Sequence, residues 1–122
     1  MGELKFKEGV VLFEPMPPAG QAILDALAKV AGTLSFDLVV TSGADGTHSG
    51  PSDPHHSGNA YDVRSHDLIN KQDILTAVMT ELGQPSPSSG GYVTAKFFGW
   101  LEQADTDNEH FHFQLRRGQV YP

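Results

Sequence analysis

The chain contains no cysteine, and this absence limits the chemistry available to it. Disulfides, cysteine-ligated zinc and a thiol nucleophile are all excluded. Any metal site must therefore use histidine, aspartate or glutamate side chains. The 122-residue chain has six histidines, and they are the first candidates for such a site.

Basic residues are also scarce. Lysine and arginine total 8 against 15 acidic residues, so the formal net charge is −7. Nucleic-acid-binding proteins usually present a basic patch, whereas the only adjacent basic pair in this chain is Arg116-Arg117. We therefore expect no nucleic-acid partner.

Long apolar runs are missing as well. No stretch approaches the 18 apolar residues of a membrane-spanning helix, so we expect no membrane span. The start, MGELKFKEGVV, lacks the apolar run and the small-residue cleavage site of a signal peptide. The sequence thus shows no targeting signal, and if the protein works outside the cell we expect another factor to export or release it.

The length is typical of one domain, and we expect residues 1–122 to form a single one. Apolar spacing predicts helices over 19–31 and 71–82, ended by Gly32 and Gly83. Extended segments are predicted at 4–13, 37–42, 59–65, 92–103 and 110–115, and 84–91 reads as a flexible connector. The last two strands form a predicted hairpin. This mixture favours an α+β fold with a small, mainly antiparallel sheet and two or three flanking helices.

Residues 43–58, GADGTHSGPSDPHHSG, form a long loop rich in glycine, serine, proline and aspartate. A loop of this length in a small domain is usually either functional or disordered. It carries His48 and His55 and leads directly into the predicted strand that contains Asp62.

The strand HFHFQL places His110 and His112 on one face and two phenylalanines on the other. The phenylalanines are ordinary core residues, but two adjacent imidazoles are costly to bury unless something uses them. The competing interpretation is a plain exposed polar face of an edge strand.

Catalytic zinc sites commonly use three protein ligands and leave a fourth position for water. His55, Asp62 and His112 could supply these three ligands. A carboxylate is disfavoured inside a strand, so a metal explains Asp62 better than chance does. Other polar residues nearby have simpler explanations, as surface or turn residues: His56, His66, Asp45 and Asp53.

Hydrolysis also needs a general base, and two residues compete for the role. Glu109 lies three residues before His112, so in an extended chain their side chains face opposite ways. Glu109 can reach a site around His112 only if the chain turns at Asn108–Glu109, which the sequence DTDN makes plausible. His110 shares a face with His112 without this condition and is the rival base or transition-state stabiliser.

Two motifs together resemble a known family. HHSGNAYD fits the pattern His-x-x-Gly-x-Ala-x-Asp, and EHFH, about 50 residues later, fits Glu-x-x-His. In this order they are similar to the zinc D-alanyl-D-alanine peptidases. That group includes D,D-carboxypeptidases, D,D-dipeptidases and the L-alanyl-D-glutamate endopeptidases of phage endolysins, and it shares its fold with the Hedgehog signalling domain. The resemblance covers residues from about 39 to 115.

The resemblance implies a Hedgehog/D-Ala-D-Ala-peptidase-like fold and a Zn²⁺ cofactor. It implies that His55, Asp62 and His112 are the zinc ligands and that Glu109 is the catalytic base. His110 falls at the first histidine of the superfamily's His-x-His pair. The implied substrate is the stem peptide of bacterial peptidoglycan, and a phage-encoded enzyme acting on the cell wall would suit the lack of a signal peptide.

The chain departs from the family at two positions. Relatives often carry an arginine in a Ser-Gly-Tyr-Arg stretch that polarises the scissile carbonyl, whereas this chain has Ala44 and Asp45 there. Asp53 stands where relatives tend to have a serine. Either His48 supplies the missing positive donor, or the activity is altered. Two alternatives follow: a zinc-stabilised, non-catalytic binding module of the same fold, or a phage structural component with an incidental histidine cluster.

Overall fold

The computed structural model describes residues 2–10, 12, 16–43, 59–65, 68–88, 91–103, 106–107, 109–116 and 118–121. The elements follow one another as β1 (Leu4–Phe6), α1 (Pro18–Leu34), β2 (Leu38–Ser42), β3 (Ala60–Arg64), α2 (Lys71–Glu81), β4 (Ser86–Ser88), β5 (Gly91–Val93), β6 (Phe97–Glu102) and β7 (His110–Leu115).

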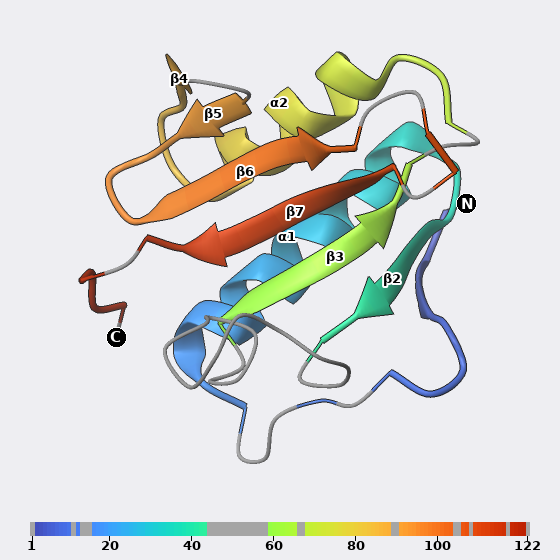
Figure 1. The fold of residues 1–122 in the computed structure, drawn as a ribbon, viewed down its shortest axis with the longest axis horizontal. Coiled ribbons are helices and arrows are strands. Elements are labelled where there is room, and N and C mark those ends of the chain that lie inside the picture. The colour runs from blue at the N-terminus through green and yellow to red at the C-terminus, as the bar shows by residue number, and fades with distance from the viewer. Residues whose placement is uncertain are drawn as a thin grey trace.

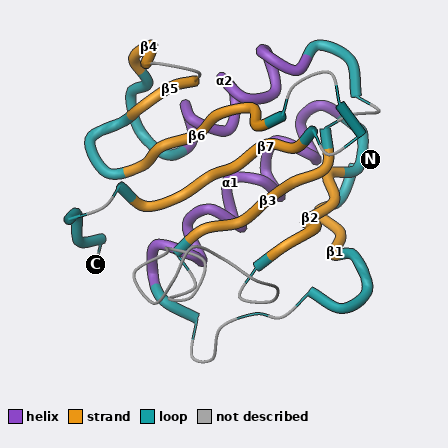
Figure 2. Tube along the Cα trace, in the orientation of Figure 1, coloured by secondary structure: helices purple, strands orange, loops and turns teal. Residues whose placement is uncertain are grey.

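All of these strands belong to one seven-stranded sheet with the order β1-β2-β3-β7-β6-β5-β4. β1 and β2 pair in parallel, and every other neighbouring pair is antiparallel. Both helices pack on the same side of the sheet, α1 behind β3 and β7 and α2 behind β5 and β6 (Figures 1 and 2). The expected α+β class and mainly antiparallel sheet are confirmed. The opposite side of the sheet carries no described helix.

Alternation along the two central strands assigns their side chains to two different environments. Tyr61 and Val63 of β3 and Phe111 and Phe113 of β7 point to the helices and are at most 1% exposed. The residues between them point to the side of the sheet that the helices leave open. We call this side, on β3, β6 and β7, the open face.

Helix α1 is longer at both ends than the predicted range 19–31. Pro18 occupies its first turn, where a missing N–H costs nothing, and Ser35 ends it in the left-handed conformation at φ 61°. The predicted stop at Gly32 is wrong. A helical glycine costs about 1 kcal/mol, too little to end a helix whose apolar side is buried through Ala31.

Helix α2 matches its predicted range to within one residue, with Leu82 as the C-cap. Its predicted apolar face, including Val78 and Met79, is buried against the sheet. Gly99 of β6 makes the approach possible, because a Cβ there would lie 2.5 Å from Met79 Sδ. No helix among the described residues is long and apolar enough to cross a membrane.

Three extended segments differ from their predictions. The predicted single strand 92–103 is two strands, because the N–H of Thr94 bonds the Phe97 carbonyl at 2.9 Å and turns the chain. The predicted connector 84–91 contains β4, which lies at the edge of the sheet. Pro87 has no N–H to donate, and an edge strand tolerates it because one side of the strand has no neighbour to bond. Residues 4–13 contribute only the three residues of β1.

The predicted C-terminal hairpin is confirmed as the antiparallel pair β6–β7. Arg116, just beyond β7, donates from Nη1 to the carbonyls of Thr94 and Ala95 at 3.1 and 3.2 Å. This basic residue therefore anchors the β5–β6 turn to the end of β7.

Candidate functional site

Three neighbouring strands bring polar residues into rows across the open face. The register pairs Asp62 with His112 and His112 with Trp100. One step along, it pairs Arg64 with His110 and His110 with Glu102. Directly opposed residues on one face lie within contact distance, so each row can act as a unit.

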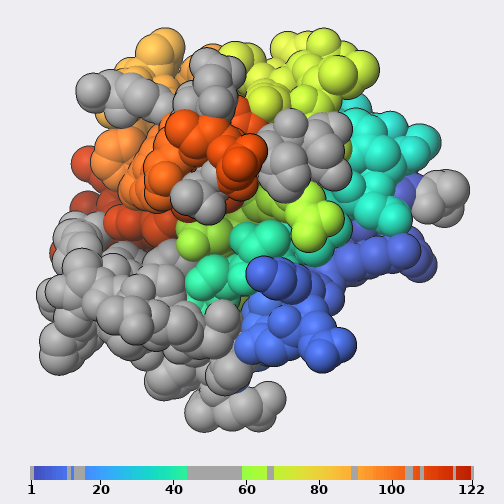
Figure 3. Space-filling model, turned by 45° about the vertical axis from the view of Figure 1, so that its right-hand side comes forward, coloured from blue at the N-terminus to red at the C-terminus, as the bar shows by residue number. Residues whose placement is uncertain are grey.

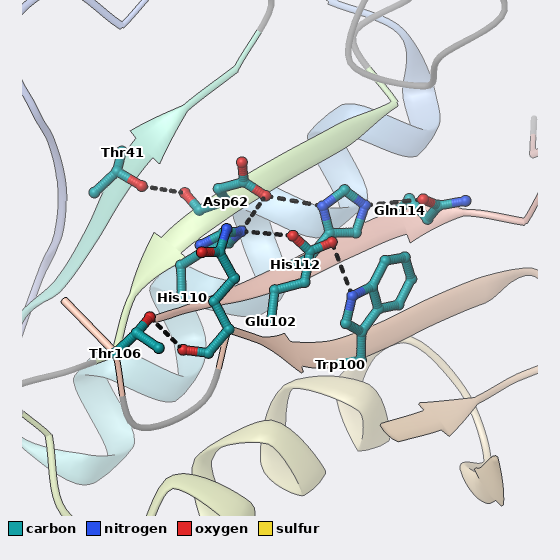
Figure 4. A network of polar contacts seen from close by, with 9 residues as sticks. Thr41, Asp62, Trp100, Glu102, Thr106, His110, His112 and Gln114 are labelled. Atoms are coloured by element: carbon teal, nitrogen blue, oxygen red, sulfur yellow. Dashed lines mark hydrogen bonds and ion pairs between the residues drawn. The ribbon is translucent and has the colours of Figure 1, made fainter. Parts of the chain in front are cut away.

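Asp62 and His112 form the centre of this arrangement (Figure 4). Asp62 Oδ1 lies 2.8 Å from His112 Nδ1, although the two residues are 50 positions apart in sequence. The other ring nitrogen, Nε2, lies 2.8 Å from Gln114 Oε1, and the indole of Trp100 stacks on the imidazole with ring centroids 4.3 Å apart. The imidazole is thus held at both nitrogens and on one flat side.

His110 belongs to the same network through a second carboxylate. Its Nε2 lies 3.1 Å from Glu102 Oε2 and 3.7 Å from Asp62 Oδ1 (Figure 4). Trp100 donates from Nε1 to Glu102 Oε1 at 3.0 Å. Two histidines and two carboxylates therefore meet on the open face, which argues against a plain solvated strand face.

Glu109 lies on the other side of the sheet. The turn on which its predicted role depends does form, since its N–H bonds the Thr106 carbonyl at 3.1 Å. Nevertheless its side chain is 2% exposed, and Oε2 accepts from Lys71 Nζ at 2.6 Å and from Ser65 Oγ at 3.0 Å. The alternation of β7 continues through the turn, so Glu109 shares a side with Phe111 and not with His112. Its role as general base stays a prediction.

The remaining predicted site residues, His48 and His55, lie outside the described residues, as do His56 and His66. Over the part of the chain that the structure describes, no group of three or more histidine, aspartate or glutamate side chains is placed to hold a metal ion. Of the three predicted ligands, the described residues therefore bring together Asp62 and His112.

The donor atoms of this pair suit a divalent metal such as zinc. A carboxylate oxygen and an imidazole nitrogen are ordinary zinc ligands. A ligating histidine usually donates its other ring N–H to a fixed acceptor. Gln114 Oε1 lies at such an acceptor position beside His112 Nε2, so Nδ1, the nitrogen beside Asp62, is the ring atom that would bind the metal. The side chains present thus fit the implied group.

Sequence reasoning missed three residues of the network: Trp100, Glu102 and Gln114. Gln114 was open to inference, because it continues the alternation that places His110 and His112 on one face. Trp100 and Glu102 lie on the partner strand of the predicted hairpin. Their positions depend on its register, which a long connecting turn does not fix.

Tyr61 precedes Asp62 but serves the core. Burial raises the pKa of its phenol, and its hydroxyl donates to Met16 Sδ at 3.2 Å. The side chain is therefore withdrawn from the open face.

Comparisons of this chain with protein-family models, with curated proteins and with solved structures find no match.

Proposed function

We propose that the protein is a zinc-dependent peptidase that hydrolyses a peptide bond in peptidoglycan stem peptides. It would act as a D,D-carboxypeptidase or as an endolysin-type endopeptidase, on a Hedgehog/D-Ala-D-Ala-peptidase-like fold. The observation that carries the proposal is the contact between Asp62 and His112, which come from the two motifs of the resemblance and meet at 2.8 Å.

Asp62, His112 and His55 would hold the metal. A zinc ion bound there supplies Lewis-acid polarisation of the scissile carbonyl and makes water a stronger acid. Gln114 and Trp100 would hold the orientation of the His112 ring, the first by its contact with Nε2 and the second by stacking. His110, which lies on the same face, would donate to the oxyanion of the transition state.

The proton acceptor in this proposal is Glu109, which would have to release Lys71 and turn to the open face. Glu102 is a second carboxylate to test, because it already lies on that face at 3.1 Å from His110. Comparing the two tells whether the family motif or the observed contacts predict the base.

The first experiment is elemental analysis of the purified protein for stoichiometric zinc. Asp62→Asn and His112→Gln should each lower zinc content by about tenfold or more, since each removes a ligand. His56→Gln removes a histidine that the sequence analysis assigns to the surface, and it should leave zinc content unchanged. Wild-type protein that takes up no zinc from a zinc-supplemented buffer would contradict the proposal.

The second experiment measures hydrolysis of isolated peptidoglycan by mass spectrometry of the released peptides. Glu109→Gln should abolish product while keeping zinc and fold, and Glu102→Gln should retain activity. The reverse result would assign the base to Glu102. Activity retained in both variants would contradict carboxylate-based hydrolysis.

The second candidate function is a zinc-stabilised binding module. The ion pair of Glu109 with Lys71 favours it, because this pair withdraws the predicted base from the site. Such a module would bind peptidoglycan peptides without releasing any product, and Glu109→Gln would leave that binding intact.

A further inference from the structure

A pocket of about 440 Å³ adjoins the histidine network at the end of β3. Its walls include Arg64 of β3, Thr41 of β2 and Lys7 just beyond β1, together with His110 from the network. The N-terminal segment (blue), β2 (green) and β3 (yellow-green) adjoin one another on the surface (Figure 3). The pocket thus shares His110 with the candidate site and adds two cationic side chains to it.

The register fixes the side of the sheet on which Arg64 lies. Arg64 is two residues beyond Asp62, on the same face, and it is the cross-strand partner of His110. Residues two apart in a strand are separated by about 6.6 Å. Arg64 therefore lies on the open face, about two extended residues along β3 from Asp62.

The backbone around Arg64 is firmly held. Its neighbours Val63 and Ser65 are both 0% exposed, and Ser65 donates to the buried carboxylate of Glu109. The guanidinium itself has no hydrogen bond or ion pair with any other residue that the structure describes. This arginine lies on a fixed strand and lines a pocket, and within the part of the chain that the structure describes no carboxylate competes with a ligand for its donors.

The charge around the pocket favours an anion locally, although the whole chain carries −7. Of the two acidic residues in its walls, Glu109 is neutralised by Lys71, and Asp107 is exposed to solvent. Just beyond the walls, the carboxylates of Asp62 and Glu102 contact His112 and His110, so the pocket cations that can meet an anion are Arg64 and Lys7. Arginine presents a planar fork of donors that matches a carboxylate with two parallel hydrogen bonds.

We propose that Arg64, assisted by Lys7, forms a subsite for the carboxylate of the substrate residue that follows the scissile bond. The inference rests on the proposed function, because it places that bond at the Asp62–His112 pair. A carboxylate one residue beyond the scissile carbonyl lies about 3.3–3.6 Å further along an extended peptide. The long Arg64 side chain would span the rest of the roughly 6.6 Å that separate Asp62 and Arg64 along β3. Arg64 thereby supplies a fixed cation beside the site, in a chain that lacks the arginine common in the resembling family.

Two sources can provide such a carboxylate. It is the terminal carboxylate in a D-alanyl-D-alanine peptide, and it is an internal glutamate carboxylate in an L-alanyl-D-glutamate peptide. The probes are N-acetyl-D-alanyl-D-alanine with its C-terminal amide, and N-acetyl-L-alanyl-D-glutamate with its diamide. The two members of each pair differ only in whether the carboxylates are free or amidated. The dissociation constant of the amide divided by that of the free acid therefore measures carboxylate recognition.

Binding is measured by NMR titration of the metal-free protein at constant ionic strength, so that hydrolysis does not interfere. The wild type should bind the free carboxylate of at least one pair about tenfold more tightly than the amide. Arg64→Ala should bring that ratio close to one, and Arg64→Lys should keep part of it. Lys29→Ala removes the same charge from a distant surface ion pair with Glu81, and it should change nothing.

A ratio above one for the first pair alone identifies a terminal carboxylate, and for the second pair alone an internal one; either supports the subsite. No carboxylate preference in the wild type, or a preference that survives Arg64→Ala, overturns it. If Arg64→Ala does not fold, Arg64→Gln and Lys7→Ala serve in its place, with the fold checked by their amide spectra.

The outcome is separable from that of the proposed function. Hydrolysis with equal kcat/KM for wild type and Arg64→Ala would keep the peptidase and remove the subsite. An Arg64-dependent carboxylate preference without zinc uptake would keep the subsite and remove the peptidase.

Discussion

The two sides of β3 and β7 differ in everything except their backbone. On the side that faces the helices, Tyr61, Val63, Phe111 and Phe113 are at most 1% exposed and apolar apart from one hydroxyl. On the open face, the same two strands carry a carboxylate, two imidazoles and an amide that contact one another: Asp62, His110, His112 and Gln114. Alternation lets the same ten or so residues supply both the core and the candidate site. The buried side chains therefore fix the backbone that also positions the polar network.

The largest difference in the free energy of unfolding is expected between substitutions at two adjacent residues of β7, one on each side of the sheet. Phe111→Ala should lower the free energy of unfolding by about 3–5 kcal/mol, because it leaves a cavity beneath the sheet. His110→Ala, one residue away, should cost only about 1 kcal/mol, for its lost contact with Glu102. Urea unfolding at pH 7 measures both. Equal losses would mean that the two sides are not energetically distinct.

The core side also contains a position where a small residue is required. Gly99→Ala should destabilise by about 1–3 kcal/mol, because the added Cβ would overlap Met79 Sδ and the Phe113 ring. Gly32→Ala is the matched control in α1, where the nearest atom, the Gly2 carbonyl oxygen, lies 4.0 Å away. That variant should gain about 0.5–1 kcal/mol from helix propensity. Thermal unfolding should therefore shift in opposite directions for the two glycines, and shifts of the same sign would refute this packing argument.

Glu109 sharpens the comparison, because it is a charged residue on the apolar side. Lys71→Met should cost about 2 kcal/mol, since it removes the cation that bonds the buried Glu109 carboxylate at 2.6 Å. The control Lys29→Met breaks an exposed ion pair with Glu81 and should cost about 0–1 kcal/mol. Denaturant midpoints distinguish the two. A loss for Lys71→Met no larger than the control's would show that Glu109 does not depend on this lysine.

The smallest effect on stability is expected at an exposed ion pair near β1, away from the core and from the polar network. The N–H of Glu3 and the ammonium of Lys5 hold the pKa of Asp37 below its ordinary value of 3.8. The folded state thus binds this proton less tightly than the unfolded state does. The contribution to stability is present above pH 3.8 and is lost as pH falls through the lowered pKa. An NMR titration of the Asp37 carboxyl should give a midpoint below 3.8; a midpoint at or above it would contradict the contact.

Periodicity within single segments predicted much of the fold correctly. The apolar faces of α1 and α2, the alternation of β7 and the final hairpin all follow from local spacing. The errors lie where local signals are weak or are overridden. A short turn at Thr94 divides one expected strand in two, and α1 continues through Gly32 to Leu34 because a single helical glycine costs too little to end it.

The candidate site was partly predictable for a similar reason. Asp62 stood out as a carboxylate inside a strand, and His110 and His112 as imidazoles opposite phenylalanines. Trp100, Glu102 and Arg64 carried no comparable signal, because each is ordinary in its own segment. They become site residues only through their cross-strand partners.

By itself, the sequence determined which residues share a face, because side-chain direction in a strand alternates from one residue to the next. Only the tertiary structure decided which faces meet. The pairing of Asp62 with His112, and of His110 with both Arg64 and Glu102, depends on a register between strands far apart in the chain. The contact of Glu109 with a lysine 38 residues away likewise depends on the packing of α2 against the sheet. Such choices are made by the burial and pairing of whole elements, which no local pattern contains.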